Sequence, residues 1–172
     1  MKVKIILGLI GVIIVGAAGW MIKNKQQPEE KVHYHAGFMV DKGNQKIDFA
    51  NPLFMSLSPC VEEDNEEPPT AAMKQIEKAH LHDNIGDVVH IEHRDARWQD
   101  LFTNINYDLD YGQAKAFMNG QPVTNFQKLP IKASDSLVVF IGDNDQDKFL
   151  AEAVTKSHIE EVGAKSEDCG TD

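Results

Sequence analysis

The sequence predicts an α+β domain that follows an N-terminal apolar segment. Three observations support this fold class: strand–turn–strand patterns recur along the chain, apolar residues repeat with helical spacing over 98–105, and a near-continuous apolar strand spans 136–141. Hairpins that flank a helix, followed by further strands and a C-terminal helix, are typical of this class. The length of 172 residues suits one domain with an appendage.

The N-terminal segment, residues 5–22, contains 18 residues without a charge. A helix of that length spans about 27 Å, close to the thickness of a bilayer core. Lysines flank it on both sides, so we expect a single-pass transmembrane anchor over 1–22 and a polar linker over 23–31. The domain, 32–172, would then lie on the extracytoplasmic side of the cell membrane. The alternative is a signal peptide that is cleaved after about residue 17, which would give a secreted protein.

The chain is acidic, with 17 Lys+Arg against 27 Asp+Glu and a net charge of −10. This balance argues against nucleic acid as a partner, because few basic residues remain to neutralise phosphates. The two cysteines, Cys60 and Cys169, lie far apart in the sequence. Outside the cytoplasm two cysteines usually pair, so we expect a disulfide between a long loop and the C-terminal tail.

The first half of the domain is predicted to contain two hairpins and a short helix. The first hairpin covers 38–49, and the Pro-rich, acidic segment 51–70 is expected to be a solvated loop. A helix is predicted over Ala71–Lys78 and a second hairpin over His80–His93. Trp98, Leu101, Phe102 and Ile105 then form one apolar helix face, which predicts the packed helix.

The second half has a hairpin with an Asn119-Gly120 turn, the dipeptide that tight hairpin turns favour. Pro122 in its second strand requires an edge or a bulge, because proline cannot donate to a neighbouring strand. Ser136–Ile141 is predicted to be a central strand. A last helix is expected over Asp147–Val162, with Gly163 past its end.

Six of the seven histidines lie between His33 and His93. They form three tight groups, which in chain order are His33 with His35, His80 with His82, and His90 with His93. Residues i and i+2 of a strand face the same side, about 6.6 Å apart along the chain. Two imidazoles at that spacing can converge on one ion, and a neutral imidazole is the commonest metal ligand. The competing interpretation is a set of exposed or hydrogen-bonded strand histidines without a metal.

The loop between the second and third groups determines whether they meet. Asp83–Asp87 fits a three-residue hairpin loop with Gly86 in the left-handed position. That loop pairs His80 with His90 and places both on one face of the hairpin. A two-residue loop would instead put His90 on the opposite face.

Three histidines plus a carboxylate form an ordinary zinc site and are acceptable to copper(II). We therefore expect zinc or copper on His80, His82 and His90, where Glu92 extends the same side. His33 and His35, from the strand that opens the domain, could complete this site or form a second one. His93 has the opposite parity to His90 and would reach the ion only at a bulge. The full candidate set is His33, His35, His80, His82, His90, Glu92 and His93.

Two further features are expected to be structural. His158 lies on the predicted last helix and is expected at the surface. Asp143–Asp147 has alternating carboxylates that resemble the start of a calcium loop, but Lys148 stands where that loop needs glycine. A turn that ends in the N-cap of the last helix accounts better for this segment.

The order of motifs resembles that of a group of small, membrane-tethered or secreted prokaryotic proteins. The resemblance covers about residues 32–163 and rests on the His33-x-His35 start, the HLHD…G…VVHIE segment over 80–92, and the Asn119-Gly120 and Asp135–Gly142 tail. It implies a β-grasp-like mixed sheet with a packed helix and a histidine-lined site. Members of the group often have histidine at the position of Glu92.

These features favour a membrane-anchored, extracytoplasmic domain that binds zinc or copper for metal handling, structural support or catalysis. In a catalytic site Glu92 could act as the base instead of a ligand. The alternative function is a non-metal interaction module whose histidine face and acidic loop contact a protein partner at the cell envelope. Neither an enzymatic activity nor a substrate follows from the sequence.

Overall fold

The structure is a computed structural model that describes residues 31–56 and 70–165. It contains a five-stranded mixed sheet and several helices. The strands are β1 (Lys31–Lys42), β2 (Val88–His93), β3 (Lys115–Met118), β4 (Gln121–Val123) and β5 (Ser136–Ile141). The helices are α2 (Ala71–Lys78), α3 (Trp98–Asn104), α4 (Gln146–Ala151) and α5 (Lys156–Gly163), with 3-10 turns η1 (Pro52–Phe54) and η2 (Phe126–Lys128).

The strand order of the sheet is β2-β1-β5-β3-β4. The two long-range neighbours β1 and β5 run parallel, whereas the pairs β1–β2, β3–β5 and β3–β4 are antiparallel. The α+β prediction with a mixed sheet is therefore confirmed. The central position of β5 is also as predicted, and Pro122 lies on the edge strand β4, where its missing N–H costs nothing.

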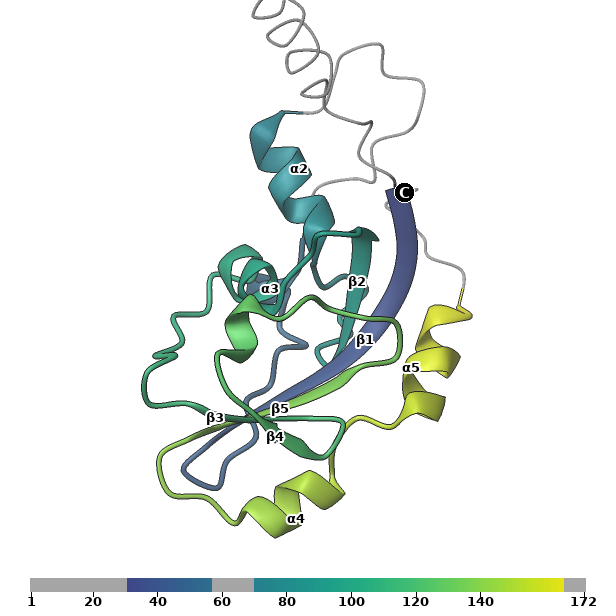
Figure 1. Cartoon of the computed structure of the whole chain (residues 1–172). Coiled ribbons are helices and arrows are strands. Elements are labelled where there is room, and N and C mark those ends of the chain that lie inside the picture. The colour runs from purple at the N-terminus through teal and green to yellow at the C-terminus, as the bar shows by residue number, and fades with distance from the viewer. Residues whose placement is uncertain (1–30, 57–69, 166–172) are drawn as a thin grey trace, which may run out of the picture.

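One face of the sheet carries the main core. Alternate residues of β1, including Phe38 and Val40, pack there with the apolar side of α3, whose Trp98 and Leu101 are fully buried. The helical spacing in the sequence thus marks the side of α3 that faces the sheet. In Figure 1 the long, curved β1 passes between α3 on one side and α5 on the other.

The opposite face is covered by the two C-terminal helices. Phe149 of α4 packs on Met39 and Phe140, and Ile159 of α5 packs on Val88 of β2. Val154, just before α5, packs directly on the backbone of β1 at Gly37. A Cβ at Gly37 would lie 2.5 Å from Cγ1 of Val154, so this position requires glycine. The same face of β1 continues through His35 and His33, so α5 ends beside the histidines.

The single last helix expected over Asp147–Val162 is wrong in extent. The chain forms two helices, because Thr155 caps a new one by accepting a hydrogen bond from the backbone N–H of His158 at 3.3 Å. The break turns Val154 onto Gly37. Gly163 lies inside the last turn of α5 and not past its end. The predicted turn and N-cap before α4 are confirmed, since Asp145 accepts from the N–H of Lys148 at 3.2 Å.

Two of the three predicted hairpins are reduced to single bridges. In the segment 38–49 the bridge between Asp41 and Lys46 replaces the expected hairpin, and in the segment 80–93 the bridge between His80 and His90 does so. The reason is that β1 pairs along its length with β2 and β5 instead. The third hairpin is confirmed. Its turn has φ of 52° at Asn119 and 77° at Gly120, the left-handed geometry that this dipeptide adopts readily.

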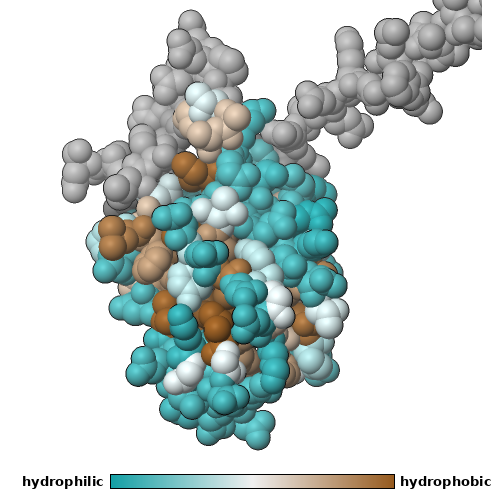
Figure 2. All heavy atoms as spheres, turned by 90° about the vertical axis from the view of Figure 1, so that its left-hand side faces the viewer, coloured by the Kyte–Doolittle hydropathy of each residue, from teal (hydrophilic) through white to brown (hydrophobic). Residues whose placement is uncertain are grey.

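Figure 2 shows one face of the domain, where hydrophobic residues form small separate groups among hydrophilic ones. Within the described part of the chain, no helix has the length and apolar character that a membrane span requires. The expected anchor over 1–22 and the linker over 23–31 lie outside the described residues, apart from Lys31. The expected disulfide between Cys60 and Cys169 also falls on residues outside the described part of the chain.

Candidate metal centre

The site is built around His90, which lies in the middle of a row of three paired backbone segments. On one side His90 pairs with His35 of β1 in the antiparallel register. On the other side it pairs with His80 through two backbone hydrogen bonds of 3.1 and 2.9 Å. Directly paired residues share a face, so the three imidazoles lie side by side on the face that α5 also covers.

The predicted pairing of His80 with His90 is thus confirmed, although the loop that produces it differs. Asp83 and Asn84, both with φ of 56°, form the turn, and the N–H of Ile85 donates to the carbonyl of His82 at 3.0 Å. Gly86 does not take the left-handed position. It is required for another reason, because a Cβ at Gly86 would lie 2.2 Å from the backbone nitrogen of Ala50.

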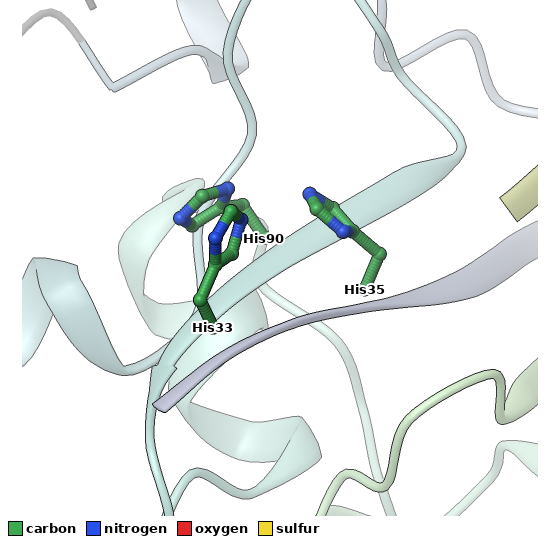
Figure 3. A group of neighbouring side chains, drawn as sticks. All are labelled: His33, His35 and His90. Atoms are coloured by element: carbon green, nitrogen blue, oxygen red, sulfur yellow. The ribbon is translucent and has the colours of Figure 1, made fainter. Parts of the chain in front are cut away.

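Five histidines form two groups that share His90 and could each hold a metal ion. In each group one ring nitrogen per residue lies within 4.8 Å of the others. We name the first group the outer trio (His33, His35 and His90) and the second the inner trio (His80, His82 and His90). Figure 3 shows the outer trio, with His33 and His35 rising from β1 beside His90 of β2.

The rings are close in both groups. The His90 ring centroid lies 4.7 Å from that of His33, 5.1 Å from His35, and 4.9 Å from each of His80 and His82. The two groups differ in exposure: His33 is exposed, whereas His80 is 9% and His90 3% exposed. The cluster therefore extends from the surface into a buried position.

Hydrogen bonds to oxygen orient two rings of the inner trio. Nδ1 of His80 lies 3.1 Å from the carbonyl oxygen of Ile76, and Nδ1 of His82 lies 2.6 Å from a carboxylate oxygen of Asp83. These oxygens accept, so each Nδ1 carries the proton and each Nε2 has a free electron pair. Histidine ligands of metals are commonly held in this way by a carbonyl or a carboxylate.

The third ring of the inner trio, that of His90, has partners on both nitrogens. Its Nδ1 lies 3.1 Å from Nε2 of His82, and its Nε2 lies 3.5 Å from a carboxylate oxygen of Glu92. With Nδ1–H of His82 directed at Asp83 and Nε2–H of His90 at Glu92, the two facing nitrogens each present an electron pair, which a cation between them would accept. Glu92 is thus placed to accept from Nε2–H of His90 while Nδ1 of that ring acts as a ligand.

The electrostatics of the site also favour a neutral ligand. Burial lowers the pKa of His80 from its ordinary 6.5 to about 4, and the neighbouring His90 acts in the same direction. His80 therefore stays neutral through the range in which an exposed histidine would protonate. No proton has to be displaced from its Nε2 when a metal binds near pH 7.

The scaffold around His80 includes a residue that the sequence analysis missed. The side-chain amide of Asn104, at the end of α3, donates to the carbonyls of Gln75 and Ala79 at 2.8 and 2.7 Å. It also lies 3.3 Å from the carbonyl of Ile76, so it caps the C-terminal end of α2 and fixes the carbonyl that His80 contacts. A single sequence could not reveal this, because Asn104 becomes a capping residue only when α2 packs on α3.

A second missed residue is Gly163. A Cβ at this position would lie 2.6 Å from Nδ1 of His35, so α5 approaches the imidazole directly. Because the Nδ1 edge of the His35 ring faces α5, its Nε2 lies on the far edge. A glycine near the end of a predicted helix suggested a C-cap, and the contact with β1 was not visible in the pattern.

Two histidines lie away from the cluster. His93 was a candidate ligand, but its side chain points to the other face of the sheet, where it is 6% exposed and its Nε2 lies 3.2 Å from Glu77. The bulge in β1 between Lys31 and Tyr34 does not bring it back. His158 is partly exposed on α5 and faces Asp87 at 3.3 Å.

Comparison of this chain with protein families, with curated proteins and with solved structures finds no match.

Proposed function

We propose that this protein binds zinc or copper through its histidine cluster. The observation that carries the proposal is the convergence of five imidazoles on two overlapping groups that share His90. Strand histidines without a ligand have no reason to be paired in register across three neighbouring segments. The oxygen acceptors on Nδ1 of His80 and His82 further support it, because they leave Nε2 of both rings available as a ligand.

The donor set favours these metals over others. Imidazole nitrogen suits zinc and copper, whereas magnesium and calcium prefer oxygen ligands. In a tetrahedral zinc site nitrogens at about 2.1 Å from the ion lie about 3.4 Å apart. Nitrogens that already lie within 4.8 Å of one another reach that geometry by small rotations of the side chains. Three histidine ligands leave a fourth position open to water, while Glu92 stays on the opposite edge of the His90 ring.

We further propose that the domain handles metal on the extracytoplasmic side of a membrane. The uncharged stretch at 5–22 supports an anchor, and the excess of acidic residues supports attraction of cations. Two features are compatible with the β-grasp arrangement that the sequence resemblance implies. Strand β1 is parallel to its neighbour β5, and α3 lies between β2 and β3 in the sequence.

The test is a metal titration of the full chain, purified and then stripped of metal. We expect zinc and copper(II) each to bind, His90→Ala to abolish binding at both groups, and His158→Ala to bind as the wild type does. His90→Gln, which keeps more of the buried volume, should show the same loss with its fold verified by circular dichroism. Absence of binding, or equal binding by the wild type and both His90 variants, would instead favour the interaction module.

A further inference from the structure

The two trios differ in a way that suggests different tasks. The outer trio begins at the exposed His33, at the end of β1, whereas the inner trio includes His80, which is 9% exposed. His90, the shared residue, is 3% exposed. His82 of the inner trio is itself partly exposed, with 23% of its side chain accessible, but the inner trio has no member as exposed as His33, so we expect an ion from solvent to meet the outer trio first.

The inner trio is better prepared to keep an ion. The carbonyl of Ile76 and the carboxylate of Asp83 fix the rings of His80 and His82, so these ligands lose little freedom on binding. In the outer trio His33 is exposed, and His35 is held against α5 at Gly163. An exposed side chain loses more conformational entropy when it is ordered around an ion, and it therefore releases the ion more easily.

We propose that a single ion uses the two trios in turn, loading on His33, His35 and His90 and then settling on His80, His82 and His90. His90 remains a ligand throughout, so the ion changes two ligands without leaving the protein. This inference rests on the proposed metal binding. It assigns the outer histidines to the rate of uptake and the inner histidines to retention.

Charge supports one ion over two. Both trios need the His90 ring, and the carboxylate placed beside that ring is that of Glu92, at 3.5 Å. Two divalent ions on one imidazole would repel each other strongly at low effective dielectric. The second ion would therefore bind much more weakly than the first.

The experiment is stopped-flow uptake and release of copper(II) by the full chain. We expect His33→Ala/His35→Ala to slow uptake about tenfold or more and to leave the release rate near that of the wild type. We expect His80→Ala/His82→Ala to load rapidly and to release copper about tenfold or more faster. His158→Ala serves as the matched histidine control and should change neither rate.

A spectroscopic readout separates the two positions. Electron paramagnetic resonance of the copper-loaded wild type should match the spectrum of the His33→Ala/His35→Ala variant and differ from that of the His80→Ala/His82→Ala variant. Two tightly bound ions per chain, or equal effects of the two double variants on both rates, would overturn this inference and leave the metal-binding proposal standing. A wild type that binds no copper or zinc would overturn both.

Discussion

The imidazoles of His82 and His90 face each other, with Nε2 of His82 3.1 Å from Nδ1 of His90. The two residues are eight positions apart in sequence and are brought together by the tight turn at Asp83 and Asn84. Each ring has an oxygen near its other nitrogen, from Asp83 and Glu92 respectively. This arrangement points two electron pairs into one small space, which a cation can occupy.

Replacing Asn104 with alanine should weaken both the fold and the metal site. Its amide donates to the carbonyl of Gln75 in α2 at 2.8 Å and to that of the C-cap residue Ala79 at 2.7 Å, and losing these bonds should lower the free energy of unfolding by about 2 kcal/mol. Because the Ile76 carbonyl moves with that turn, copper affinity should fall as well. Chemical denaturation and metal titration measure the two effects. Gln99→Ala, on the exposed side of the same helix, is the control, and equal behaviour of the two variants would contradict this role.

Replacing Gly163 with alanine should disturb the site through His35. The new Cβ would lie 2.6 Å from Nδ1 of His35, so the imidazole or α5 must shift. We expect slower metal uptake, with a loss of stability of about 1–2 kcal/mol. The control is Gly112→Ala, whose Cβ would meet only a carboxylate oxygen of Asp110 at 3.3 Å. A Gly163→Ala protein with unchanged uptake would show that His35 does not contribute.

The contact of Gly37 with Val154 can be tested by a double-mutant cycle. Gly37→Ala places a Cβ 2.5 Å from Val154 Cγ1 and should cost about 1–3 kcal/mol of stability. In the Val154→Gly background the same change should cost clearly less, because both Val154 atoms that the new Cβ would approach, Cγ1 at 2.5 Å and Cβ at 2.6 Å, are gone. Thermal unfolding of the four proteins gives the coupling. Additive effects would mean that Val154, which precedes α5, does not pack on β1 at this point.

The stability of the metal-free protein should depend on pH through His80. Its pKa is lowered from 6.5 to about 4, so the unfolded chain binds the proton more tightly than the folded one. The free energy of unfolding should therefore decrease as the pH falls from 6.5 towards 4, by up to about 3 kcal/mol from this residue. Denaturation of the wild type and of His80→Gln at several pH values measures the difference. A wild-type dependence no steeper than that of the variant would contradict the burial of a neutral His80.

Much of the fold follows from local patterns. The Asn119-Gly120 turn, the apolar spacing of α3 and the apolar run of β5 each specify their element within a few residues of sequence. The pairing of β1 with β2 and β5 does not, because partners distant in sequence are set by packing of the whole sheet. The break before α5 was missed for the same reason: it places Val154 on Gly37, a contact between positions 117 apart in sequence.

All five histidines of the cluster were candidates from the sequence, but only the inner three could be placed relative to one another. His80 and His90 belong to one hairpin, so their shared face follows from the parity of the strands. The arrival of His33 and His35 beside His90 depends on the register between β1 and β2, in which His35 pairs with His90. The residues that orient the rings, such as Asn104 and Gly163, act through tertiary contacts and have no sequence signature.

Direct location of the ion tests the central claim most sharply. Crystals of the zinc-loaded protein, measured at the zinc absorption edge, should show an anomalous peak about 2.1 Å from a ring nitrogen of His90 and of two further histidines of the cluster. We expect His80 and His82 to be those two. A peak bound by other residues, or imidazoles that hold no ion in zinc-saturated crystals, would contradict it.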